Sequence, residues 1–298
     1  MTLGRMAVLQ PFGFLAIEEA EVPAPTGHQV AVEMFAAAIT AADVALLARS
    51  DEPGWQPLVP GLEGAGVVTA SPIAVTRVNV GDQVVIGATS EGAERADRPV
   101  STWTTNALVD EHHVAPFPRD VGTDRDSLGL LGATAAVAAT LATQVGEAEA
   151  DEPVVVAGSG GLALATVATL RAAGAASIVA VAPDHAHAAA AAAGASLCLS
   201  IGTDLGAAGA RRGFDCREEI SPDPGALDPG LAWTDARTQP LDRDRAMAAL
   251  TQWMAAGHFS PSVAIGKRYT IEQINEAVME IEGGRIAGAG LVVMEPLK

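Results

Sequence analysis

One segment, residues 153–175, limits the possible folds more than any other part of the chain. Its sequence, PVVVAGSGGLALATVATLRAAGA, joins a short run of small and β-branched apolar residues to a glycine turn and then to a run of helix formers. A second strand-like run, SIVAVA, follows at 177–182, then a helical segment, PDHAHAAAAAAGAS, and a third run, LCLSI. Strands that alternate with helices in this way pair in parallel. The segment therefore predicts an α/β domain built on a buried parallel sheet.

The turn after the first of these strands is the most specific local motif. Residues 158–163 read G-S-G-G-L-A and fit the pattern G-x-G-x-x-G/A where a strand becomes a helix. The first glycine permits a tight turn, the second lets backbone N–H groups approach a pyrophosphate, and a small third residue lets helix and strand pack closely. The alternative is a glycine-rich turn that binds no ligand. The motif predicts a dinucleotide site formed by Gly158, Ser159, Gly160, Gly161, Leu162 and Ala163.

The tip of the second strand bears on the choice of cofactor. An acid there would accept a hydrogen bond from the 2′-hydroxyl of the NAD ribose, whereas an arginine or serine would suit the 2′-phosphate of NADP. The chain has Ala182 and Pro183 at this point, and Asp184 follows one or two residues late. Asp184 would repel a 2′-phosphate unless His185 or His187 offsets its charge. NAD(H) and NADP(H) both stay open, with NAD(H) slightly favoured.

The first third of the chain has a different character. Short β-rich runs alternate with turn residues: MAVLQ, QVAVEMFAAAI, GAGVVTA and QVVIGA. A helical spacing interrupts them at 39–48, where Thr40 can cap a helix and Asp43 completes a capping box. Helical patterns cover 126–145, 243–256 and 271–282, and a last strand, GLVVMEP, closes the chain. The chain thus changes character after about residue 120, from β-rich runs to strands that alternate with helices.

Composition excludes several classes of partner. The chain has 298 residues, with 18 Lys and Arg against 36 Asp and Glu, so neither a nucleic-acid backbone nor an anionic membrane surface suits its charge of −18. Two apolar stretches, 128–145 and 154–170, are dominated by Ala, Gly and Thr, which favours a buried helix and a buried strand-turn-helix over membrane spans. With two cysteines and no apolar leader, a cytoplasmic protein is expected.

Several further motifs are spread over nearly the whole chain: P-G-L-E-G-A-G-V at 60–67, V-G-D-Q-V at 80–84, T-W at 102–103, G-A-T-A at 132–135, and the closing segment 283–293. Their order and spacing resemble the medium-chain dehydrogenase/reductase superfamily. The resemblance implies an α/β fold with a GroES-like β-barrel domain of residues 1–120, completed by 258–298. It also implies an abbreviated Rossmann-type parallel-sheet domain of residues 121–257 that binds a nucleotide.

Whether the chain could bind zinc can be judged from the residues at the positions of the superfamily's zinc ligands. Zinc-dependent members of the superfamily carry a cysteine in an A-A-G-x-C-x-x-D stretch and a histidine in G-H-E, whereas this chain reads AAAITAAD at 36–43 and GLE at 61–63. Cys198 and Cys216 cannot make up a four-cysteine structural site. His112 and His113 are expected in a strand, where they would face opposite sides. The chain is therefore similar to the zinc-free quinone oxidoreductase and enoyl reductase branch, and no zinc is expected.

The branch implies few catalytic side chains, because the cofactor supplies the hydride while the protein orients a conjugated carbonyl and excludes water. Thr40 could hydrogen-bond the substrate carbonyl or the cofactor, Asp43 could orient it, and Thr134 could contact the nicotinamide end. Each also has a structural interpretation, as an N-cap, a first-turn capping acid and a hydroxyl bonded to its own helix. Trp55 and Trp103 could line an apolar substrate pocket or serve only in packing.

Two departures from the superfamily leave alternatives open. Residues 206–242 are too short for all the helix and strand repeats of a complete Rossmann domain, and the ribose-binding acid is not in its usual place. The favoured function is a zinc-independent NAD(P)H-dependent oxidoreductase acting on a small conjugated carbonyl, enone or quinone. The alternatives are a non-redox lyase, isomerase or cyclase acting in the interdomain cleft, and a silent binding subunit. The resemblance also implies a homodimer.

Overall fold

The computed structural model describes residues 2–52, 55–87, 100–121, 123–145, 152–205, 209–217, 228 and 230–295. The chain forms two compact units. The first comprises Met1–Ala133, Lys267–Arg285 and Gly290–Lys298, and the second comprises Thr134–Gly266 and Ile286–Ala289. The domain boundaries predicted from the sequence lie between residues 120 and 121 and between residues 257 and 258.

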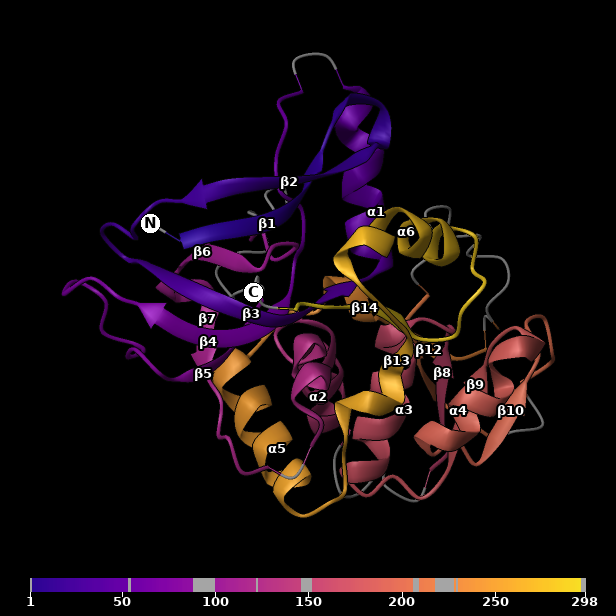
Figure 1. Cartoon of the computed structure of the whole chain (residues 1–298). Helices are drawn as coiled ribbons and strands as arrows, with labels where there is room; N and C mark the ends of the chain where they lie inside the picture. Colours follow the sequence, from indigo (N-terminus) through magenta and orange to yellow (C-terminus); the bar gives the residue numbers. More distant parts are fainter. Residues whose placement is uncertain are drawn as a thin grey trace. The chain divides into compact units, whose positions relative to one another are not determined.

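Strands dominate the first unit. In its described part, β1 and β2 form an antiparallel hairpin, and a seven-stranded sheet has the order β13-β14-β3-β4-β5-β7, with β6 paired to β3 beside this path (Figure 1). Two helices accompany the strands. The bounds are β1 Thr2–Leu9, β2 Leu15–Val22, β3 Gln29–Ile39, β4 Gly64–Ala70, β5 Gln83–Ile86, β6 Asn106–Asp110, β7 Val114–Pro116, β13 Ile265–Tyr269, β14 Ala289–Val293, α1 Ala41–Leu47 and α6 Ile274–Glu282.

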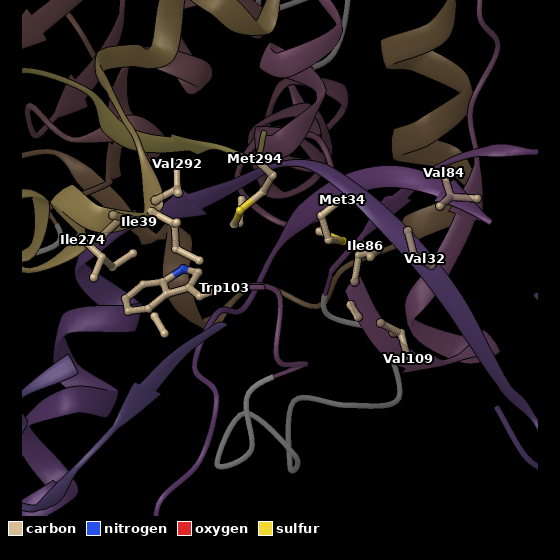
Figure 2. Packing of buried hydrophobic residues seen from close by; sticks show 14 of the residues in the cluster. Val32, Met34, Ile39, Val84, Ile86, Trp103, Val109, Ile274, Val292 and Met294 are labelled. Carbon is tan, nitrogen blue, oxygen red and sulfur yellow. The ribbon is translucent and has the colours of Figure 1, made fainter. Parts of the chain in front are cut away.

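The core of the first unit follows from strand periodicity. Along β3, Val30, Val32 and Met34 are buried, while Glu33 between them is exposed, as expected for side chains that alternate between two faces. Figure 2 shows the indole of Trp103 in the same part of the core as Ile39, Ile274 and Val292. Residues more than 150 positions apart in sequence thus share one apolar core, and this core fixes the end of β3.

The second unit is built on a parallel sheet. Its strands are β8 Val154–Ala157, β9 Ile178–Val181, β10 Leu197–Leu199, β11 Arg212–Asp215 and β12 Ala232–Asp235, in the order β10-β9-β8-β11-β12. All of the neighbouring pairs are parallel. The helices are α2 Thr134–Gln144, α3 Gly161–Ala172, α4 His187–Ala193 and α5 Arg243–Ala255. This strand order reverses direction between β8 and β11, which is the topological switch point of a Rossmann-type sheet.

The two faces of this sheet differ. The Cys216 Sγ, just past β11, lies 3.5 Å from the Thr166 Oγ1 of α3, and α3 in turn contacts α2 and α4. A second buried cluster contains Val155 and Ala157 of β8. It also includes Leu205 and Leu231, which lie outside the strands. Described residues between β10 and β11, and between β11 and β12, contain no α-helix.

Most predicted elements are confirmed. The α/β fold class is correct, and the helical spacings at 39–48, 243–256 and 271–282 correspond to α1, α5 and α6. The helix predicted over 126–145 is wrong in its first part, because Arg125–Leu130 forms a 3-10 helix capped by Asp124 and α2 begins at Thr134. Among the described residues, none of the helices combines the length and apolar character that a membrane span needs.

The prediction that His112 and His113 lie in a strand is also wrong. They belong to a 3-10 turn, Glu111–His113, between β6 and β7. The Asp110 carboxylate accepts a hydrogen bond from the His112 N–H at 3.0 Å, and this local bond replaces strand pairing. The His113 Nδ1 lies 3.2 Å from the Gly87 carbonyl oxygen.

Candidate functional site

Asp43 is the centre of a buried hydrogen-bond network in the first unit. Its Oδ2 accepts hydrogen bonds from the N–H of Thr40 at 2.9 Å and from the Thr40 hydroxyl at 2.8 Å. Its Oδ1 accepts from the N–H of Leu62 at 3.0 Å. Thr40 is the N-cap of α1, and the capping box predicted from the sequence is present. One carboxylate therefore joins the end of β3 to the segment that precedes β4.

Burial sets the protonation of this carboxyl group. Asp43 is fully buried, and the loss of hydration raises its pKa from 3.8 to about 6, although the hydrogen bonds from Thr40 and Leu62 act in the opposite direction. Thr40 itself is 7% exposed, so the hydroxyl that contacts Asp43 is the outer member of the pair. The network thus contains a carboxyl group that changes protonation within the range in which enzymes work.

The segment that carries Leu62 is held against Trp103. The Trp103 N–H donates to the Pro60 carbonyl at 3.1 Å, and its indole Nε1 donates to the Ala38 carbonyl at 2.9 Å. Gly61 has a φ of +108°, and a Cβ there would collide with Thr102 and with the Trp103 backbone. Trp103, which the sequence predicted as a pocket residue, is fully buried, and its indole N–H already has a hydrogen-bond partner. Its observed role is to fix the segment that donates to Asp43.

Trp55, the second predicted pocket residue, differs from Trp103. It is partly buried against the same core, and its backbone N–H donates to the Glu52 carbonyl at 3.2 Å. Its indole Nε1 is buried and has no hydrogen-bond partner in the part of the chain that the structure describes. A buried indole N–H without a partner is unusual.

Glu63 is a buried acid that the sequence did not single out as a site residue. Its side chain is 1% exposed, and Oε2 accepts a hydrogen bond from the Ala133 N–H at 2.8 Å. Its backbone carbonyl accepts from the Thr102 hydroxyl at 3.0 Å. The motif G-L-E was the available signal, because a charged residue between apolar ones before a strand requires a partner.

The side chains near Asp43 do not make a metal site. Across the residues that the structure describes, no group of three or more His, Cys, Asp and Glu side chains is arranged to hold a metal ion. At the two positions where the zinc-binding pattern requires cysteine and histidine, the chain has Thr40 and Leu62, and both donate hydrogen bonds to Asp43. An aliphatic side chain and a hydroxyl that is committed as a donor do not provide the ligand set of tetrahedral zinc.

The glycine turn of the second unit has the geometry that a pyrophosphate site requires. Gly158 has a φ of +132°, and a Cβ there would lie 2.7 Å from the Cys216 carbonyl oxygen beyond β11. Gly160 is the N-cap of α3, a helix of 12 residues, so the capping residue adds no side chain at the helix N-terminus. The Ser159 carbonyl accepts from the Gly288 N–H at 2.8 Å, which fixes the turn. These residues fit a bound dinucleotide phosphate.

At the tip of β9 the structure places Asp184 on the surface, with its side chain 84% exposed. The Ser200 hydroxyl donates to its Oδ1 at 2.5 Å, and the ring of His187 lies 4.0 Å from the same oxygen. Thr134, the other predicted cofactor contact, is the first residue of α2 and is 7% exposed. Asp184 therefore lies beyond the strand end as an exposed acceptor, while Thr134 is almost covered.

Comparison with known proteins agrees with this organisation. Residues 26–146 match the alcohol dehydrogenase GroES-like domain family. S-(hydroxymethyl)glutathione dehydrogenase from Komagataella pastoris is 41% identical over 80 residues, which are 27% of this chain and 21% of that protein. The matched segment thus spans about a fifth of the curated relative.

Solved structures extend the likeness to the whole fold. A thermostable alcohol dehydrogenase from Pyrobaculum aerophilum superposes with a TM-score of 0.79 at 19% identity, covering 98% of this chain and 100% of that one. An alcohol dehydrogenase from E. coli CFT073, solved in complex with NADH, gives a TM-score of 0.76 at 15% identity, with 99% and 100% covered. Residues 26–146 are therefore similar to the alcohol dehydrogenase GroES-like domain, and nearly the whole chain has the same fold as these two alcohol dehydrogenases.

Proposed function

We propose that the chain is a zinc-independent NAD(P)H-dependent oxidoreductase that reduces a small conjugated carbonyl, enone or quinone. The observation that carries the proposal is the turn at Gly158, where a positive φ and the close approach of the Cys216 carbonyl exclude a side chain and a glycine N-cap begins α3. The E. coli structure of the same fold contains NADH, which supports this assignment.

In this proposal Gly158, Ser159, Gly160 and Gly161 hold the pyrophosphate, and the exposed carboxylate of Asp184 receives the adenosine ribose. An exposed acid suits two ribose hydroxyls better than a 2′-phosphate, so NAD(H) is the preferred cofactor. When bound, the nicotinamide would supply hydride to the substrate.

Thr40 and Asp43 provide the proton. Thr40 donates its single hydroxyl hydrogen to ionised Asp43, so in this state it can only accept a hydrogen bond from a substrate hydroxyl. When Asp43 Oδ2 is protonated, the carboxyl group can donate to Thr40 Oγ1 instead, and the Thr40 hydrogen becomes available to a substrate carbonyl oxygen. Reduction then transfers this proton to the substrate oxygen, and Asp43 resupplies Thr40 through the 2.8 Å contact. The ionised pair favours the reverse, oxidative direction.

Zinc independence is supported by the same network. Leu62 has no metal-binding atom in its side chain, and its backbone N–H is directed to the Asp43 carboxylate at 3.0 Å. Polarisation of the substrate carbonyl in this proposal therefore comes from a hydrogen-bond donor, the Thr40 hydroxyl.

The test is isothermal titration of the purified protein with NADH and with NADPH, followed by assay of reduction of a small enone and a small quinone. We expect NADH to bind and to be oxidised in the presence of one of these substrates. If neither cofactor releases binding heat on titration and neither shifts the unfolding temperature, the chain is not an NAD(P)H-dependent oxidoreductase.

A second candidate function is a non-redox lyase, isomerase or cyclase. The observation in its favour is that Thr40 and Asp43 already form a proton donor and acceptor pair that needs no cofactor, with the pKa of Asp43 raised to about 6. If neither nicotinamide cofactor binds, proton exchange at the α-carbon of a bound carbonyl compound, followed by NMR in D2O, would be the next measurement.

A further inference from the structure

Two identical ion pairs end the neighbouring strands β11 and β12. In Asp215-Cys216-Arg217 the arginine Nε donates to Oδ1 at 2.9 Å and its Nη2 donates to Oδ2 at 2.9 Å. In Asp235-Ala236-Arg237 the same two bonds have the same lengths. In both cases the arginine backbone N–H also donates to Oδ1. The sequence did not single out this repeated Asp-x-Arg pattern.

Strand register places both acids in the last paired row of the sheet. Leu199, Val181, Ala157, Asp215 and Asp235 follow one another across β10, β9, β8, β11 and β12. Ala157 immediately precedes the glycine turn, so the two Asp-x-Arg pairs lie on the far side of the switch point from β9. Strands in a sheet are about 4.8 Å apart, which puts the end of β12 about 10 Å from the end of β8.

The two pairs differ in exposure. The side chains of Arg217 and Asp215 are 8% and 11% exposed, whereas those of Arg237 and Asp235 are 36% and 35% exposed. The inner pair is therefore part of the sheet edge itself. The outer pair presents polar atoms to solvent and is the one that a ligand can reach.

The outer pair still has both donors and acceptors to offer. In the described part of the chain, the Nη1 group of Arg237 makes no hydrogen bond, and Nη2 uses one of its two hydrogens. Asp235 Oδ1 accepts two hydrogen bonds and Oδ2 accepts one, which leaves an acceptor position on Oδ2. Donor and acceptor positions thus lie next to each other, 2.9 Å apart, on one edge of the pair.

The surroundings hold this edge still. The Thr238 hydroxyl and the Gln239 amide both donate to the Asp235 carbonyl oxygen at 3.2 Å, and the turn Ala236–Thr238 packs on α2. The Asp235 carboxylate raises the pKa of Arg237, which keeps the guanidinium charged. A charged pair with zero net charge repels anions through its acid and cations through its base, so it suits a neutral group that both donates and accepts.

From this geometry we propose that Asp235 and Arg237 recognise the primary carboxamide of the nicotinamide ring, with the amide oxygen on Arg237 and the amide N–H on Asp235 Oδ2. The inference rests on the proposed function, because it assumes that a nicotinamide dinucleotide binds at the glycine turn. Adenosine lies on the β9 side of the switch point, so the other half of the dinucleotide extends over β11 and β12. Its carboxamide is the one neutral group there with a donor and an acceptor side by side on an sp² frame.

The test compares ligands that differ only at this end. NADH, NAD+, ADP-ribose, which lacks the nicotinamide, and nicotinic acid adenine dinucleotide, which has a carboxylate in place of the amide, are titrated calorimetrically into wild type, Arg237→Gln and Asp235→Asn. We expect Arg237→Gln to lower the preference for NADH over ADP-ribose by about tenfold, or about 1.4 kcal/mol, with the affinity for ADP-ribose unchanged. Asp235→Asn should remove the wild-type discrimination against nicotinic acid adenine dinucleotide relative to NAD+.

Arg211→Gln is the matched control, because Arg211 is an exposed arginine that pairs with Glu152 next to the opposite, amino end of β11. It should bind all four ligands as wild type does. Equal losses for NADH and ADP-ribose in the Arg237 variant would show a structural role and overturn the assignment, as would an unchanged ratio between NAD+ and its carboxylate analogue in Asp235→Asn. Absence of ADP-ribose and NADH binding in wild type would instead overturn the proposed function, and the assignment with it.

Discussion

The Asp43 carboxylate accepts a hydrogen bond from the backbone N–H of Leu62, 19 positions further along the chain, at 3.0 Å. The same carboxylate accepts two hydrogen bonds from Thr40, so it joins the N-terminus of α1 to the segment before β4. In the proposed function, the protonation state of this carboxyl group decides whether the Thr40 hydroxyl can donate to a substrate.

Replacement of Thr40 tests its role directly. We expect Thr40→Val to lower kcat for enone or quinone reduction about 100-fold or more, because the substrate oxygen loses its proton donor. Stability should fall by about 1 kcal/mol through loss of the helix cap. Thr40→Ser keeps the hydroxyl and should retain most of the activity, measured by NADH oxidation at 340 nm. Equal activity of the Val and Ser variants would remove Thr40 from the mechanism.

The pH dependence of the rate follows from the raised pKa of Asp43. Reduction requires the protonated carboxyl group, so kcat for reduction should fall as the pH rises through about 6, whereas alcohol oxidation should rise over the same interval. Asp43→Asn cannot titrate, and both dependences should disappear from its profile. A wild-type profile that is flat between about pH 5 and 7 would contradict the Thr40–Asp43 relay.

Asp43 also links stability to pH. Its pKa is about 6 in the folded chain against an ordinary value of 3.8, so the folded state binds the proton more tightly than the unfolded state. Its contribution to the free energy of unfolding is therefore fully present below about pH 4 and is lost as the pH rises through about 6. The whole effect corresponds to about 3 kcal/mol.

This linkage is measured by urea unfolding of wild type and Asp43→Asn across the same pH interval. Because other titrating groups are common to both proteins, the difference between their free energies of unfolding isolates Asp43. Wild type should lose stability relative to the variant as the pH rises. Parallel curves would show that the carboxyl group titrates normally.

Substitutions at two glycines can separate an effect on NADH binding from an effect on stability. Gly158→Ala places a Cβ against the Cys216 carbonyl at a φ of +132°, so we expect at least tenfold weaker NADH binding and a lower unfolding temperature. Gly174→Ala is the matched control, since Gly174 also has a positive φ, +98°, but no atom lies within 4 Å of an added Cβ. It should lose stability while NADH binds as in wild type. Equal affinity in the two variants would count against the turn as the phosphate site.

Metal removal tests zinc independence. Dialysis against EDTA should leave the rate of reduction unchanged, and added Zn²⁺ should not increase it, because Leu62 offers no side-chain ligand beside Thr40. Elemental analysis of the active protein checks the same point. A rate that falls on chelation and returns with one equivalent of zinc would require another set of ligands.

Local sequence determined much of this protein. The strand-turn-helix at 153–175, the capping box of Thr40 and Asp43, and the helices at 243–256 and 271–282 were predicted because each depends on interactions within a few residues. The absence of Cys and His from 36–43 and 61–63 was equally visible. Local side-chain caps prevailed over the predicted periodicity at 111–113 and 125–130, where Asp110 and Asp124 cap 3-10 turns in place of the predicted strand and helix.

Other features of the site depend on contacts between segments far apart in the chain. The bond from Leu62 to Asp43 and the burial that raises its pKa need the fold of the first unit, and no local pattern encodes desolvation. The alignment of Asp215 with Asp235 needs strand register, which is set by pairing across the sheet. The residue types available for proton transfer and phosphate binding are therefore visible in the sequence. Packing and strand register determine the environment of these residues, and hence their chemistry.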